Sequence, residues 1–97
     1  MCKMFELTPI DGRKSFYGKA HAVFYLNERR ECVWECHSYG TLVCSYNSDK
    51  REFTRLWSGY SVTTMRHVNA FLKYIGMSYG GKNWWDTIPV NRPVKMI

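Results

Sequence analysis

The segment YSVTTMRH, residues 60–67, brings hydroxyl groups, a guanidinium and an imidazole together in one short run. Such groups could form a catalytic or ligand-binding site, or they could begin an ordinary helix. Ser61 is suited to be a helix N-cap, because its hydroxyl can accept a hydrogen bond from a backbone N–H of the first turn. Tyr60 and Met65 then occupy the positions of a hydrophobic staple. Three polar residues of the segment are left without such a role: Thr63, Arg66 and His67.

Hydrophobic spacing predicts that this helix covers about residues 62–75. Apolar residues recur at intervals of three and four from Val62 to Ile75, and Gly76 stands where helices commonly end. A polar row on the helix is expected to point away from the rest of the protein; it contains Thr63, Arg66, His67, Lys73 and Tyr74. Cationic and aromatic side chains on one rigid face can hold a phosphate or an acidic partner surface. We therefore take this row as a candidate partner-binding site.

The residues before the helix alternate with the period of β-strands. Strands are expected over 15–26, within 31–47 and over 51–57, with a short one near residues 5–7. The predicted fold is therefore α+β: an antiparallel β-meander of three to five strands, with the one helix packed on one face. Residues 77–97, rich in Gly and Pro, read as an irregular tail that Trp84 and Trp85 pin to the body.

The register of the hairpin over 31–47 can be argued from its apolar residues. A two-residue loop at Tyr39–Gly40 competes with a three-residue loop over 38–40. The longer loop pairs Cys36 with Leu42 and places most of the apolar side chains on one face. Because a buried face specifies register strongly, we favour the longer loop. A second candidate partner-binding surface then lies on the outer face of the sheet and at the hairpin tip: Tyr17, Lys19, His21 and Tyr39.

The cysteines raise the question of a metal site. In the run Cys32-x3-Cys36-His37-x6-Cys44 the first two cysteines lie on one strand, ~13 Å apart at ~3.3 Å per residue. That separation is too large for one zinc ion. Cys36 and Cys44 would be diagonal neighbours and remain the candidates for zinc, although free cysteines commonly pack as small hydrophobes. We expect no cofactor, with a small zinc protein as an alternative.

Composition sets the class of protein. The 97 residues fit a single domain over 1–97, and 45% hydrophobic residues exclude a disordered chain. No apolar run is long enough for a membrane helix, and the first residues do not resemble a signal peptide, so a cytoplasmic location is expected. The sequence contains no hydrolytic motif, P-loop or dinucleotide fingerprint, so we expect no enzyme. The net charge of +6 is spread along the chain, which argues against a DNA mimic and only weakly for nucleic-acid binding.

Two blocks of the sequence, SYGTLV at 38–43 and YSVTTMRH at 60–67, together resemble a family. The pattern is similar to that of small proteins of unknown function encoded by bacteriophages, prophages and plasmids, and LTPIDGRKSFYGKA at 7–20 resembles the start of some of them. The likeness covers about residues 7–75 and departs from the pattern at Cys44, where a small residue such as Ala is expected. It implies no catalytic residues.

What the resemblance implies is a habitat in the cytoplasm of an infected or lysogenic bacterial host. A small mobile-element protein without reaction motifs is expected to act stoichiometrically on a host machine, as anti-CRISPR proteins do. Our leading hypothesis is a non-enzymatic protein that binds and inhibits a host defence complex, such as an RNA-guided nuclease. The alternatives are a basic nucleic-acid-binding accessory protein and the small zinc-binding protein considered above.

Overall fold

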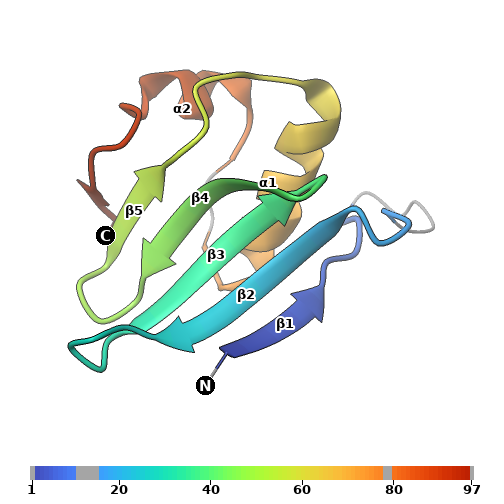
Figure 1. Ribbon diagram of the computed structural model, residues 1–97. Coiled ribbons are helices and arrows are strands. Elements are labelled where there is room, and N and C mark those ends of the chain that lie inside the picture. The colour runs from blue at the N-terminus through green and yellow to red at the C-terminus, as the bar shows by residue number, and fades with distance from the viewer. Residues whose placement is uncertain (1, 11–15, 78–79, 97) are drawn as a thin grey trace.

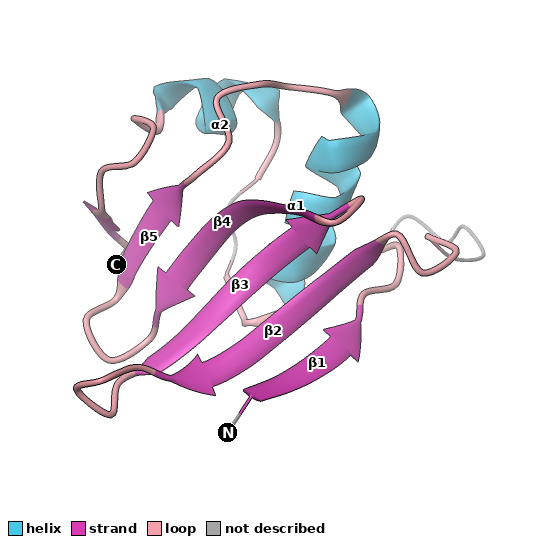
Figure 2. Ribbon diagram, viewed as in Figure 1, coloured by secondary structure: helices cyan, strands magenta, loops and turns pink. Residues whose placement is uncertain are grey.

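The computed structural model describes residues 2–10, 16–77 and 80–96. Within these residues the fold is α+β, with a six-stranded antiparallel sheet and two helices on one of its faces (Figures 1 and 2). The elements in chain order are β1 (Cys2–Glu6), β2 (Ala20–Leu26), β3 (Cys32–Ser38), β4 (Thr41–Asn47), β5 (Glu52–Arg55), α1 (Val62–Tyr74), α2 (Lys82–Thr87) and β6 (Val94–Lys95). Each strand pairs with the next in the chain, so the sheet is a meander.

The α+β class, the meander and the main helix are confirmed, while two other predictions are wrong. The described residues form six strands rather than three to five. The tail is not irregular, because α2 and β6 form within it and β6 pairs with β5. Neither helix of the described residues has the length and hydrophobicity that crossing a bilayer requires.

Both ends of α1 are fixed by the hydrogen bonds that its sequence predicts. The Ser61 hydroxyl accepts from the Thr64 backbone N–H at 3.0 Å, which caps the first turn. At the other end Gly76 has φ +84°, and its N–H donates to the Lys73 carbonyl at 3.1 Å. The N–H of Met77 donates to the Leu72 carbonyl at 2.8 Å, which completes a Schellman motif.

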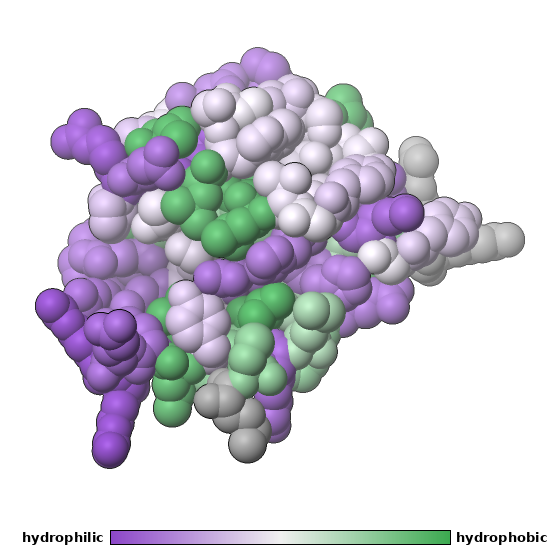
Figure 3. Space-filling view, in the orientation of Figure 1, coloured by the Kyte–Doolittle hydropathy of each residue, from purple (hydrophilic) through white to green (hydrophobic). Residues whose placement is uncertain are grey.

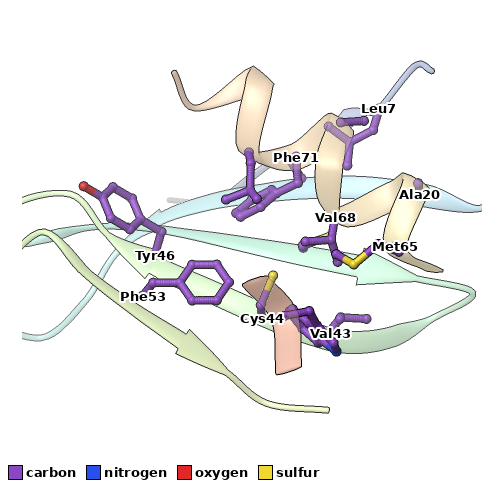
Figure 4. Packing of buried hydrophobic residues seen from close by; sticks show 14 of the residues in the cluster. Leu7, Ala20, Val43, Cys44, Tyr46, Phe53, Met65, Val68 and Phe71 are labelled. Atoms are coloured by element: carbon purple, nitrogen blue, oxygen red, sulfur yellow. The ribbon is translucent and has the colours of Figure 1, made fainter. Parts of the chain in front are cut away.

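The core lies between α1, α2 and one face of the sheet (Figure 4). Val68 and Phe71 of α1 are fully buried and face Cys44 and Phe53 of the sheet. Burying a side chain of this size contributes about 1.5–3 kcal/mol relative to leaving it exposed. Trp85 of α2 closes the core beside β5.

The β3–β4 hairpin corrects the predicted register. Its loop has two residues, Tyr39 and Gly40, with φ of +53° and +79°, so Ser38 pairs with Thr41. A β-bulge then shifts the register, so that Cys36 pairs with Cys44 and not with Leu42. The bulge turns Val43 into the core together with its neighbour Cys44. Sequence periodicity of two could not reveal it, because a bulge breaks that period.

Arg55 is buried and joins three parts of the chain. Its guanidinium stacks on the ring of Trp85, 4.4 Å from the centroid. Its N–H groups donate to five backbone carbonyls, those of Trp57 (2.8 Å), Ser58 (2.9 Å), Gly59 (3.1 Å), Trp85 (2.7 Å) and Ile88 (3.5 Å). A guanidinium carries five N–H donors, so each has an acceptor. The side chain therefore ties β5 to the loop before α1 and to α2.

Replacing Arg55 should be among the most destabilising changes in the chain. Arg55→Ala leaves the five carbonyls without their donors and removes the packing on Trp85, so the free energy of unfolding should fall by about 3 kcal/mol or more. Urea unfolding followed by tryptophan fluorescence measures this. Arg92→Ala, at an exposed arginine, is the control and should change stability by less than about 0.5 kcal/mol. Equal small effects of the two variants would contradict the role given to Arg55.

Candidate partner-binding site

The two sequence blocks at 38–43 and 60–67 meet in the fold. The Ser38 hydroxyl lies 2.7 Å from Nδ1 of His67 and 3.3 Å from the hydroxyl of Thr64. All three side chains are buried between the end of β3 and the first turns of α1. Polar residues from both blocks therefore form one hydrogen-bonded cluster.

His67 does not point into solvent, so this part of the predicted site is wrong. Its side chain is buried, with 1% of the residue exposed. The ring contacts Phe16, 4.4 Å between centroids, and Tyr39 at 5.4 Å. The prediction from helix periodicity is wrong here because the segment at Phe16 and the hairpin tip pack against the side of α1 that was expected to face solvent.

The Ser38–His67 pair has the separation of a nucleophile and its base, yet its surroundings give it a packing role. Both residues are almost completely buried, so a substrate carbonyl has no access to the Ser38 hydroxyl. Burial lowers the pKa of His67, and the neighbouring Arg66 charge lowers it further. The neutral form of His67 is therefore favoured, and the ring is a satisfied polar group in the core.

Above this cluster, three segments meet at one end of the sheet: the turn before β2, the β3–β4 hairpin and the start of α1 (Figure 1). We name their outward residues the tip surface: the exposed Tyr17, Lys19, Tyr39 and Val62, with the half-buried Thr63 and Arg66. The Tyr39 backbone N–H donates to the Lys19 carbonyl at 2.8 Å, which joins the hairpin tip to the turn before β2. The Arg66 guanidinium lies 5.2 Å from the centroid of the Phe16 ring, which joins α1 to the same turn. The tip surface is therefore held by the fold and is not a set of independent loops.

The tip surface is apolar and cationic at once. Tyr17, Tyr39 and Val62 are exposed by 77%, 58% and 68%. Lys19 and Arg66 lie beside them, and the segments 16–19, 38–41 and 57–69 contain no carboxylate. The first turn of α1 has no acidic residue either, so the positive end of the helix dipole is not neutralised by its own side chains.

Both tyrosines sit where the backbone favours other residues. Tyr17 and Tyr39 each have φ +53° and are followed by Gly18 and Gly40, also at positive φ. Such turns normally take Asn, Asp or Gly at the first position. Large side chains at left-handed positions cost stability, and residues of this kind cluster at functional sites.

Comparison with known proteins places the chain in a family. A model of a family of unknown function, DUF8033, matches residues 5–87. The chain belongs to this family. No curated protein matches the chain, and no solved structure does. The span that matches DUF8033 includes the whole tip surface and ends where α2 ends.

The remaining predicted residues of this DUF8033 protein lie away from the tip surface. His21 is on the open face of the sheet, directly across from His37, where apolar and hydrophilic side chains alternate (Figure 3). Lys73 and Tyr74 are on the last turn of α1. The Tyr74 ring packs against the ring of Trp34, 5.8 Å between centroids, which gives this tyrosine a structural contact.

Two residues of the site were missed by sequence reasoning. The spacing of Val62 predicts a place in the buried stripe, but it is the first residue of α1 and is exposed. Ser38 was placed in a three-residue loop, whereas it ends β3 and points to His67. The Tyr39–Gly40 dipeptide, read as a two-residue turn, would have put Ser38 on the face of the sheet that meets α1.

The zinc candidates Cys36 and Cys44 are cross-strand partners in the core, not diagonal neighbours. Both are fully buried free thiols. Burial and the adjacent Cys36 raise the pKa of Cys44 well above its ordinary value, which disfavours the thiolate that a metal needs. The described residues contain no group of three or more His, Cys, Asp or Glu arranged to hold a metal ion.

The lowered pKa of His67 predicts an acid-sensitive fold. Because the unfolded state binds a proton more readily, this contribution to stability is complete above about pH 6.5 and is lost as pH falls toward the lower pKa of the folded state. His67→Asn keeps a polar atom near Ser38 and should remove that part of the pH dependence, while lowering stability at pH 8 by about 1–3 kcal/mol.

Urea unfolding between pH 8 and pH 5, in steps of about half a unit, measures the effect on both sides of the ordinary histidine pKa. His21→Asn, on the open face, is the matched control and should keep the contribution of His67. The same acid slope in wild type and His67→Asn would show that His67 is not the titrating group.

Proposed function

We propose that this protein has a non-enzymatic binding function and docks on a protein partner through the tip surface. The observation that carries the proposal is the exposure of Tyr17, Tyr39 and Val62 side by side with two cations at one end of a rigid sheet. Tyrosine and arginine are enriched at the centres of protein interfaces, where they act as anchors. The strained backbone under both tyrosines also favours a role for their side chains beyond folding.

A protein partner fits the tip surface better than a nucleic acid. Nucleic-acid affinity comes mainly from phosphate contacts, and the tip surface offers only Lys19 and Arg66 for them. Its largest exposed areas are apolar and aromatic, and the absence of carboxylates in its segments suits a partner with an acidic rim. The partner is therefore a protein with an apolar pocket bordered by acidic residues.

The narrower proposal concerns the identity of that partner. The likeness of residues 38–43 and 60–67 to proteins of phages, prophages and plasmids supports a host defence complex, such as an RNA-guided nuclease, met in the cytoplasm of a bacterial host. The protein would then act as an inhibitor by occupying a site on that complex. There are two alternatives. Nucleic-acid binding at the tip surface is distinguished by the nuclease treatment in the experiment below. Zinc binding predicts stoichiometric metal in the purified protein.

Removing the two exposed rings should abolish partner binding without unfolding the protein. Tyr17→Asn/Tyr39→Asn places at both left-handed positions a residue that tolerates them, so the turns should be kept. Met4→Gln is the control, because Met4 is 66% exposed on β1, outside the tip surface. A photocrosslinking residue at position 39 should capture one protein from nuclease-treated host lysate, and the same residue at position 4 should not.

Affinity is then measured with the captured protein in purified form. The tyrosine double variant should bind at least about a hundredfold more weakly, as expected for the loss of interface anchors, while Met4→Gln should bind as wild type does. If the partner is an RNA-guided nuclease, wild type should inhibit DNA cleavage in vitro and the double variant should not. If capture disappears when the lysate is treated with nuclease, the tip surface binds nucleic acid and not a protein. Equal affinity of wild type, the tyrosine double variant and Met4→Gln would refute the proposed site.

A further inference from the structure

The end of the sheet opposite the tip surface consists of two turns that are tied to each other. One joins β2 to β3 over residues 27–31, and the other joins β4 to β5 over residues 48–51. The Ser48 N–H donates to the Cys32 carbonyl at 3.0 Å, and the Cys32 N–H donates to the Asp49 carboxylate. Strongly hydrophilic side chains project from this end of the molecule, on the side of Figure 3 where Figure 1 shows these turns.

Each of the two turns holds an arginine at a left-handed position. Arg30 has φ +62° and Arg51 has φ +56°. Positive φ favours Gly or Asn, and an arginine has no local reason to occupy it. Both arginines are exposed, and within the described residues no hydrogen bond, ion pair or ring contact holds either side chain. The backbone is thus strained at two arginines whose guanidinium groups make no contact inside the described fold.

The neighbouring carboxylates are occupied by donors of the turns themselves. Glu31 accepts from the amides of Asn27 (2.9 Å) and Asn47 (3.1 Å), and its other oxygen lies 3.9 Å from the Lys50 ammonium. Asp49 accepts from the Cys32 N–H, and the carboxylate of Glu52 lies 3.9 Å from Lys95. Glu28 is the remaining carboxylate of this end, and Arg29 beside it also acts on the Glu31 carboxylate. The three guanidinium groups of Arg29, Arg30 and Arg51 are exposed, against two exposed carboxylates, Glu28 and Asp49.

We propose that Arg29, Arg30 and Arg51 bind the sugar–phosphate backbone of a nucleic acid. Guanidinium groups match phosphate oxygens in geometry and charge, and two short turns can place three of them along one strand. A protein partner is disfavoured, because this end lacks an exposed aromatic anchor and Leu26 is its only large exposed hydrophobic residue among those described. This site is separate from the tip surface and does not depend on the function proposed for it.

Fluorescence anisotropy with labelled oligonucleotides of about 20 nucleotides, as single-stranded RNA, duplex RNA and duplex DNA, tests the site over a range of salt concentrations. Arg30→Gly/Arg51→Gly is the informative variant, because it relieves both strained positions while it removes two phosphate contacts. We expect its melting temperature to rise by a few degrees and its affinity to fall about tenfold or more. The slope of log K against log salt should become shallower by about 1.4 for single strands and about 1.8 for duplex DNA.

Lys3→Ala/Arg92→Ala removes the same charge from other exposed positions and should leave affinity close to that of wild type. Arg30→Asn/Arg51→Asn provides a second test that keeps the turns if the glycine variant fails to fold. Equal losses in the control would mean that only net charge matters, and would overturn the site. The site would also be overturned by unchanged binding in both arginine variants or by the absence of salt-dependent binding in wild type. It would be overturned as well if wild type bound polyglutamate as tightly as it binds the oligonucleotides.

Discussion

The buried guanidinium of Arg55 is the interaction on which the rest of the structure depends. A charge in the interior is tolerated only when its donors are satisfied, and here they are satisfied by backbone carbonyls of two separate segments. Residues 57–59 and 85–88 must therefore converge on the end of β5 in every folded molecule. The sheet, the loop before α1 and the C-terminal helix are fixed by the same side chain, although they are distant in sequence.

This constraint reaches the tip surface through the loop that follows β5. The N–H groups of Leu56 and Trp57 both donate to the carbonyl of Val43, at the bulge in β4. The Arg55 side chain donates to the carbonyls of residues 57–59, and the chain then reaches Ser61, the N-cap of α1. The helix start is thus bound to β4 and β5 before the Ser38–His67 hydrogen bond fixes it to β3. Because these contacts fix the start of α1 on the sheet, the tip surface above them is preorganised.

The sequence allowed the features that depend on local chemistry to be predicted. The bounds of α1, its Ser61 cap and the role of Gly76 follow from residues within one or two turns of each other. The hairpin register could not be predicted, because a single bulge residue, Val43, alters which side chains face each other. The position of His67 depends on Phe16 and Tyr39, and α2 depends on Arg55; both are long-range contacts that leave no periodic signal. The candidate site was therefore found in part: its tyrosines and cations were named, but their grouping and the burial of His67 were not.

Residues at positive φ stand in the turns at both ends of the sheet, where the two binding surfaces are proposed. The turns at one end hold Tyr17 and Tyr39 at positive φ, and those at the other hold Arg30 and Arg51. The same backbone geometry thus displays aromatic rings at one end and guanidinium groups at the other. Strand β3, with seven residues, separates the two ends by ~23 Å at ~3.3 Å per residue, so occupation of one does not obstruct the other. A ribonucleoprotein offers a protein surface and a phosphate backbone at such a distance, whereas a free protein or a free nucleic acid offers only one of them. If both proposals hold, avidity between two weak sites selects the assembled complex over its separate components.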